Sequence, residues 1–258
     1  MERFAARGWR TLGLPDLGAI ARGERAAGEH ELVITFDDAY RGLRDHAFPV
    51  LEGLGFQAIC FVITDFAGKL NRWDVAYGGR RFAHLTWRDM RRWQSRGITF
   101  ASHTATHPRL TWLDGESARS ELVRSRVAIE RALDAPVSAV SYPFGAARVR
   151  ELRLAREAGY EFGFTLGSAA IMSDTRAVVT AREGEVDPSF ASLAMPRLPV
   201  YLWSPPLPGA GALSRPERWA ARAANRCAVG TTIWQRWRER VPATRSTSRR
   251  PEAASDGA

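Results

Sequence analysis

The chain has 258 residues, of which 45% are hydrophobic and 25% charged, and it holds only two cysteines, Cys60 and Cys227. This composition is that of an ordinary globular protein, and it excludes a mostly disordered chain, a collagen-like fibre and a disulfide-stapled scaffold. The formal net charge is +9, and residues 215–258 contribute +6 of it, so the basic character belongs to the C-terminal segment.

Segments of strand-like and helix-like periodicity alternate along the first 200 residues. Strands are expected at 32–36, 57–63, 98–101, 137–142 and 161–166, with a further candidate at 198–201. Helices are expected over a stretch that stops near Gly53 or Gly55, and over 87–95, 114–133 and 151–158. This alternation with short connections predicts an α/β fold, either a parallel barrel or an open sheet.

The character of the chain changes after Tyr201, where a Pro-rich stretch precedes an S-x-x-E capping box and an apolar stripe at helical spacing. We therefore expect three parts: a catalytic domain over 1–203, a linker with an amphipathic helix over 204–241, and a basic disordered tail over 242–258. The helix either packs on the barrel or makes peripheral contact with an anionic membrane, because it combines tryptophan with arginine.

No apolar stretch approaches the roughly 18 residues of a membrane span, and the N-terminus lacks the apolar region of a signal peptide. The sequence as written is therefore expected to be cytoplasmic. It contains no motif typical of specific nucleic-acid binding, so the basic tail suggests at most an accessory contact.

Two adjacent carboxylates, Asp37 and Asp38, follow the first predicted strand. Barrel enzymes place catalytic groups at the carboxyl ends of their strands, and neighbouring side chains there can divide the work of binding a metal and moving a proton. The alternative is an ordinary helix N-cap.

Two of the five histidines, His103 and His107, lie four residues apart directly after the strand at 98–101. Neutral imidazoles are good ligands for zinc and similar divalent ions. With a strand-end aspartate they make a two-His, one-carboxylate set that leaves metal positions open. The alternative is a pair of surface histidines.

Tyr142, Pro143, Phe144 and Gly145 follow the strand at 137–142. A proline beside an aromatic residue and a glycine makes a stiff turn, which can aim a backbone N–H at a developing oxyanion. An ordinary strand-to-helix turn is the alternative.

These three motifs, in this order, resemble the polysaccharide deacetylase (NodB homology) family, carbohydrate esterase family 4. Residues 35–38 read T-F-D-D, residues 103–107 read H-T-A-T-H, and residues 142–145 read Y-P-F-G. Residues 85–90, 97–103 and 195–200 are similar to the bacterial exopolysaccharide-type branch. The resemblance spans roughly residues 30–201 and implies a distorted (β/α) barrel and a metal-dependent hydrolase of N-acetylated sugars.

The resemblance also implies roles for individual residues. Asp38, His103 and His107 would bind the metal, most often Zn²⁺, and Asp37 would be the general base. The Phe144 backbone N–H would help to hold the oxyanion. The substrate would be a polysaccharide or oligosaccharide of the N-acetylglucosamine type.

The sequence departs from the family pattern at three places. Ala39 stands where glycine is usual, and Ser141 stands where an arginine usually orients the base. No histidine follows His107, so the usual late general acid is absent, and the segment near Arg197 occupies that region. A catalytically weak or inactive carbohydrate-binding relative is therefore the alternative function.

The remaining histidines, His30, His46 and His84, have no partner motif, and we expect them to be structural or exposed. Trp73 and Asp74 precede the second motif, where an aromatic face could line a sugar cleft, although a lone tryptophan more often serves packing.

Overall fold

The computed structural model describes residues 1–73, 81–166, 188–198 and 200. The α-helices are α1 (Glu2–Ala5), α2 (Leu14–Ala21), α3 (Phe48–Gly53), α4 (Trp87–Gln94), α5 (Gly115–Leu133) and α6 (Val149–Glu157). The strands are β1 (Arg10–Thr11), β2 (Glu31–Leu32), β3 (Thr35–Phe36), β4 (Ala58–Val62), β5 (Ile98–Ser102), β6 (Ala139–Ser141), β7 (Phe162–Leu166) and β8 (Met195–Arg197). Shorter turns of helix are η1 (Leu43–Ala47), η2 (Thr64–Phe66), η4 (Leu110–Trp112), η5 (Pro143–Gly145) and η6 (Pro188–Ala194).

The expected linker and helix at 204–241 and the tail at 242–258 lie outside the described residues, as does the suggested membrane contact. None of the helices within the described ranges is both long enough and apolar enough to cross a membrane.

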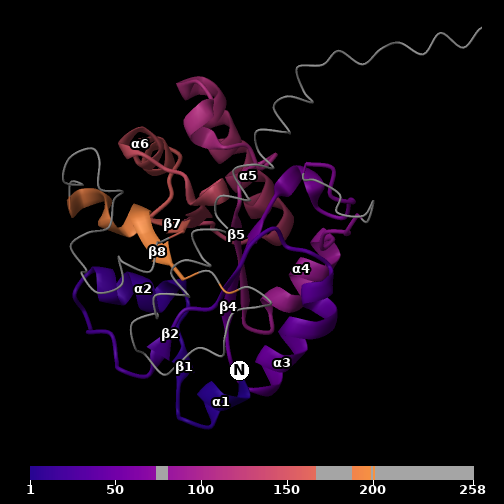
Figure 1. The fold of residues 1–258 in the computed structure, drawn as a ribbon, viewed down its shortest axis with the longest axis vertical. Helices are drawn as coiled ribbons and strands as arrows, with labels where there is room; N and C mark the ends of the chain where they lie inside the picture. The colour runs from indigo at the N-terminus through magenta and orange to yellow at the C-terminus, as the bar shows by residue number, and fades with distance from the viewer. Residues whose placement is uncertain (74–80, 167–187, 199, 201–258) are drawn as a thin grey trace, which may run out of the picture.

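Six parallel strands form the main sheet in simple chain order, from β3 at one edge to β8 at the other. Successive strands are joined through α3, α4, α5, α6 and η6 in turn, and Figure 1 shows the helices following the outside of the curved sheet. Because β3 and β8 each pair with one neighbour among the described residues, this part of the chain forms a half-barrel with two edges. The predicted distorted (β/α) barrel is confirmed in this form.

Strand β4 shows why its sequence is an unbroken apolar run. Ala58, Cys60 and Val62 face the helices and join the larger core cluster, whereas Ile59 and Phe61 face the interior of the half-barrel. All five side chains are buried. A parallel strand that is covered on both faces has no solvent side, so it shows no alternation with polar residues.

The N-terminal segment covers the interior side of the sheet, an arrangement that sequence reasoning did not identify. Its strands β1 and β2 have two residues each and pair in parallel, which is too short for a period of two to be recognised. Between them, α2 places Leu14 and Leu17 against the interior cluster that contains Phe61.

The strand predicted at 198–201 is not found at residues 198 and 200, and residues 199 and 201 lie outside the described ranges. The strand is β8, Met195–Arg197, whose register pairs Phe164 with Met195 and Leu166 with Arg197. Pro196 has no N–H to donate to a neighbouring strand. It is tolerated in β8 because β8 lies at the edge of the described sheet. That proline is also why the segment did not read as a strand.

We expect Gly163→Ala to destabilise the fold by about 1–3 kcal/mol, the usual cost of overpacking a core. A Cβ atom at Gly163 on β7 would meet the Leu193 carbonyl oxygen, and it would lie 2.6 Å from the Tyr142 hydroxyl. Gly53→Ala is the matched control, because nothing lies within 4 Å of its Cβ position. Urea unfolding measures both. Equal midpoints for the two variants would contradict the close packing of β7 on η6.

Candidate functional site

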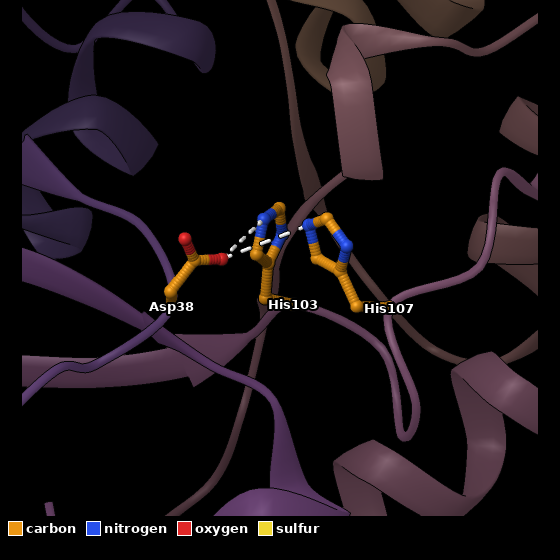
Figure 2. Close-up of side chains that lie close together, drawn as sticks. All are labelled: Asp38, His103 and His107. Atoms are coloured by element: carbon orange, nitrogen blue, oxygen red, sulfur yellow. Dashed lines mark ion pairs between the residues drawn. The ribbon is translucent and has the colours of Figure 1, made fainter. Parts of the chain in front are cut away.

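Three side chains from two strand ends converge at the carboxyl edge of the half-barrel. Asp38 follows β3, His103 follows β5, and His107 ends the turn after His103. Asp38 Oδ1 lies 3.5 Å from His103 Nε2 and 3.6 Å from His107 Nε2. Figure 2 shows the carboxylate facing both imidazole rings. One ligand atom from each residue lies within 4.8 Å of the other two.

The two histidines are oriented in different ways. His103 Nδ1 lies 2.7 Å from the Ser141 carbonyl oxygen. Since a carbonyl only accepts, Nδ1 carries the proton and Nε2 presents its lone pair to the cluster. Among the described residues His107 Nδ1 has no hydrogen-bond partner. Its ring instead lies between Trp73 at 4.1 Å and Phe144 at 4.9 Å between ring centroids.

The cluster fits a divalent metal ion. Burial lowers the pKa of His103 and holds the pKa of His107 well below its usual value, so both rings are neutral. His103 Nε2 has no proton to donate to Asp38, because Nδ1 carries it. The separations of 3.5 and 3.6 Å between Asp38 Oδ1 and the two Nε2 atoms exceed the usual hydrogen-bonding distance. Two imidazole nitrogens and one carboxylate oxygen that converge at this spacing make the donor set of an open zinc-type site.

Asp37 lies beside this cluster and is bound by an arginine. Arg197, the last residue of β8, donates from Nη1 and Nη2 to the two Asp37 carboxylate oxygens, each at 2.8 Å. Arg197 Nη2 also donates to Ser141 Oγ at 2.7 Å. The Arg197 side chain is only 10% exposed, whereas that of Asp37 is 31% exposed. The base candidate is therefore fixed from one side and open to solvent on another.

Opposing effects act on the Asp37 carboxyl. Burial raises its pKa, but the positive charge of Arg197, the neighbouring His103 and His107, and the hydrogen bonds from the guanidinium together outweigh burial and hold the pKa well below its usual range. Asp37 is consequently ionised at neutral pH. Position 141 carries a serine where an arginine usually orients the base. Arg197 brings its guanidinium to the same place, because it contacts both Ser141 and Asp37.

The loops that carry the site have unusual backbone conformations. Asp38, Ala39, Thr104, His107 and Phe144 all have φ between 53° and 66°. Positive φ costs energy for residues other than glycine, and such residues cluster at functional sites. Ala39 is fully buried and has φ 53°. Glycine would suit this position because it adopts positive φ without steric cost.

Glu121 on α5 holds the turn between the two histidines. Its Oε2 accepts from the N–H groups of Ala105 and Thr106 at 2.9 and 2.8 Å, and its Oε1 accepts from Thr106 Oγ1 at 2.8 Å. One buried carboxylate thus accepts hydrogen bonds from three donors of a turn that is not part of the sheet.

Sequence reasoning selected Asp37, Asp38, His103 and His107, and the structure places the four together. Phe144 is also at the site, where its ring contacts His107. Arg197 and Glu121 were missed as site residues. A bidentate arginine partner 160 positions away leaves no local signal, and Glu121 reads only as one charge on a helix.

The other histidines and Trp73 lie as follows. His84 is buried, whereas His30 and His46 are exposed. Trp73 is 8% exposed and packs against His107, which is the packing role rather than an open cleft wall. Asp74 lies outside the described residues.

The fold and the site together define a protein with a parallel (β/α) half-barrel and an Asp–His–His cluster at its carboxyl edge. Residues 24–163, more than half of the chain, match the family model described as polysaccharide deacetylase. The chain therefore belongs to the polysaccharide deacetylase family.

Individual relatives agree with this assignment. The protein YxkH of Bacillus subtilis (strain 168), provisionally named a polysaccharide deacetylase, is 28% identical over 174 residues, which cover 67% of this chain. The chain spans 58% of the length of YxkH.

Two solved structures share the fold. Streptococcus pyogenes deacetylase PplD, in complex with acetate, has a TM-score of 0.57 at 22% identity, over 66% of this chain and 73% of that one. BC0361, a polysaccharide deacetylase from Bacillus cereus, has the same TM-score and identity, over 77% of this chain and 54% of that one.

We expect Glu121→Ala to cost at least about 2 kcal/mol of unfolding free energy, because one buried and two partly buried donors lose their acceptor. Glu116→Ala, an exposed change in the first turn of the same helix, is the control and should cost under about 1 kcal/mol. Denaturant unfolding followed by circular dichroism compares them. If both variants unfold at the same midpoint, Glu121 does not hold the 105–106 turn.

Proposed function

We propose that this chain is a metal-dependent deacetylase that hydrolyses N-acetyl groups of N-acetylglucosamine-type polysaccharide, in exopolysaccharide biosynthesis. The observation that carries the proposal is the Asp38–His103–His107 cluster with a separate, ionised Asp37 beside it. Asp37 is held by Arg197 and not by the two imidazoles, so it can act as a base separately from the ligand set. Family membership supports a polysaccharide substrate.

Asp38 Oδ1, His103 Nε2 and His107 Nε2 are the atoms that would hold the ion. Zn²⁺ suits two imidazole nitrogens and one carboxylate oxygen, with positions left over for water and substrate. When bound, the ion would supply Lewis-acid chemistry by polarising the acyl oxygen and making a water molecule more acidic. Ser141 supports this set through its carbonyl, which keeps the His103 Nε2 lone pair directed inward.

Asp37 is the group that takes the proton from the attacking water. Its exposed side gives water access, and Arg197 keeps it ionised and fixed in direction. The water oxygen bonds to the acetyl carbon as Asp37 takes the proton. The Phe144 N–H, presented by a turn with φ 61°, is the proposed donor to the developing oxyanion.

The leaving nitrogen needs a proton when the carbon–nitrogen bond breaks. No histidine follows His107 in the sequence, so the usual late acid of the family is absent. Asp37 holds the water proton at that stage, and its low pKa makes the protonated carboxyl a strong donor. It returns the proton to nitrogen, which releases acetic acid and a free amine and restores the starting carboxylate.

A catalytically weak or inactive carbohydrate-binding relative is the second candidate. The missing late histidine is the observation that favours it. Ser141 in place of arginine does not favour this candidate, because Arg197 contacts Ser141 and binds the Asp37 carboxylate instead.

Two variants separate the roles at the site. Asp37→Asn should keep one equivalent of Zn²⁺ and lose roughly 10²–10⁴-fold in turnover, the usual worth of a general base. His107→Ala should lose both the ion and turnover. Metal analysis and amine release from N-acetylglucosamine oligomers measure the two properties, and Asp45→Asn, an exposed carboxylate, is the control.

Each contrary result has a clear meaning. Parental turnover in Asp37→Asn would place the base elsewhere. A parent that binds zinc and the oligomers but releases no amine would support the binding relative. Full zinc occupancy in His107→Ala would contradict the ligand set.

Arg197 should control the pH dependence of turnover. Its charge lowers the pKa of Asp37, so Arg197→Gln should raise that pKa and move the acid limb of kcat/KM to higher pH. Since the base must be ionised, activity is then lost earlier as the pH falls. We also expect a fall in kcat of roughly 10–100-fold, as for other outer-shell partners.

Arg197→Lys should restore part of the charge effect but not the two-point contact. Arg96→Gln is the control, because Arg96 stacks on Trp93 and pairs with Glu52, and it makes no contact with Asp37. An acid limb that stays in place in Arg197→Gln would mean that another group titrates.

A further inference from the structure

His84 contacts the groups around the candidate metal site without belonging to the ligand set. It is 1% exposed and lies in the segment that runs beside the loop after β3. Its ring stacks on Tyr40 with centroids 4.7 Å apart. Its two ring nitrogens face two different partners, and each partner leads to a different candidate ligand.

The first partner is the backbone of Asp38. His84 Nδ1 lies 2.6 Å from the Asp38 carbonyl oxygen, and a carbonyl only accepts, so Nδ1 is the donor. The second partner is Trp73, whose Nε1 lies 3.3 Å from His84 Nε2. Indole N–H only donates, so Nε2 is the acceptor. The two bonds together select one neutral tautomer.

The bond to Asp38 acts on strained backbone. Asp38 and Ala39 have φ 66° and 53° in succession, an arrangement that persists only where neighbouring contacts enforce it. The Leu85 N–H donates to the Ala39 carbonyl at 2.8 Å, and the His84 ring donates to the carbonyl just before it. These bonds fix the direction in which the Asp38 side chain leaves the chain.

The bond to Trp73 acts on His107. Among the described residues His107 Nδ1 has no hydrogen-bond partner, so ring contacts orient the imidazole. The nearest of these is Trp73, at 4.1 Å between centroids. An indole that is held at its Nε1 keeps one angle against His107. His103 needs no such support, because its Nδ1 bonds to Ser141.

We propose that His84 is a positioning residue for the metal site, which fixes Asp38 through its carbonyl group and His107 through Trp73. The inference rests on the proposed metal site, and it assigns that site a dependence on a residue outside the ligand set. Outer-shell partners of metal ligands set ligand orientation and hence affinity.

The test is the affinity of the metal-free protein for Zn²⁺, measured by chelator competition. His84→Phe keeps a ring on Tyr40 but removes both hydrogen bonds, and it should weaken binding roughly 10–100-fold. His84→Asn retains a donor at the δ position and should weaken binding less. His46→Asn, an exposed histidine on η1, is the matched control and should bind as the parent does.

The absorption spectrum of the Co²⁺-loaded protein reports coordination geometry and adds a readout that a general loss of stability does not move. It should change in His84→Phe and recover in part in His84→Asn. Parental zinc affinity and an unchanged spectrum in folded His84→Phe would overturn the inference while leaving the metal site intact. A parent protein that binds no zinc would overturn both.

If His84→Phe fails to fold, Trp73→Phe takes its place. That variant keeps the bond from His84 to Asp38 and removes only the indole N–H. It should weaken zinc binding, and parental affinity would overturn the route through Trp73. Parental affinity in a folded His84→Leu as well, which has neither the donor nor the acceptor, would overturn the inference as a whole.

Discussion

The ion pair between Arg197 and Asp37 joins the two edges of the half-barrel. Strands β3 and β8 stand at opposite ends of the strand order, yet Arg197 donates to Thr35 Oγ1 and to both oxygens of Asp37 at the end of β3. The guanidinium also lies over Phe61 and Phe164, which fill the interior. One side chain therefore fixes the spacing of the edges, the direction of the carboxylate and its charge.

The site is assembled from groups that each depend on a neighbouring element. The Ser141 carbonyl orients His103, Glu121 on α5 holds the turn that leads to His107, and His84 supports the backbone of Asp38. Positive φ at several of these loop positions is energetically unfavourable. The hydrogen bonds that hold these loops come from buried side chains such as His84 and Glu121. Binding chemistry and packing are thus supplied by the same contacts.

Sequence reasoning located the strand-end motifs because their residues are contiguous and follow apolar runs. Asp37, Asp38, His103 and His107 come together for the reason that the carboxyl ends of parallel strands share one edge. Arg197 could not be found in this way, because β8 contains a proline and its partner lies 160 residues earlier. The bonds of His84 likewise depend on a loop path that no periodicity encodes, and the N-terminal strands are too short to show a pattern.

The distance along the chain between Asp37 and Arg197 separates assembly of the candidate metal site from positioning of the candidate base during synthesis. All three candidate ligands lie before residue 108, and the Ser141 carbonyl follows on β6. Chains grow from the N-terminus, so the ligand cluster can form while β8 is still unmade. In that interval Asp37 would lack the guanidinium that fixes its direction and whose positive charge lowers its pKa. The carboxylate that would act as the base is therefore held in place only when the last described strand docks.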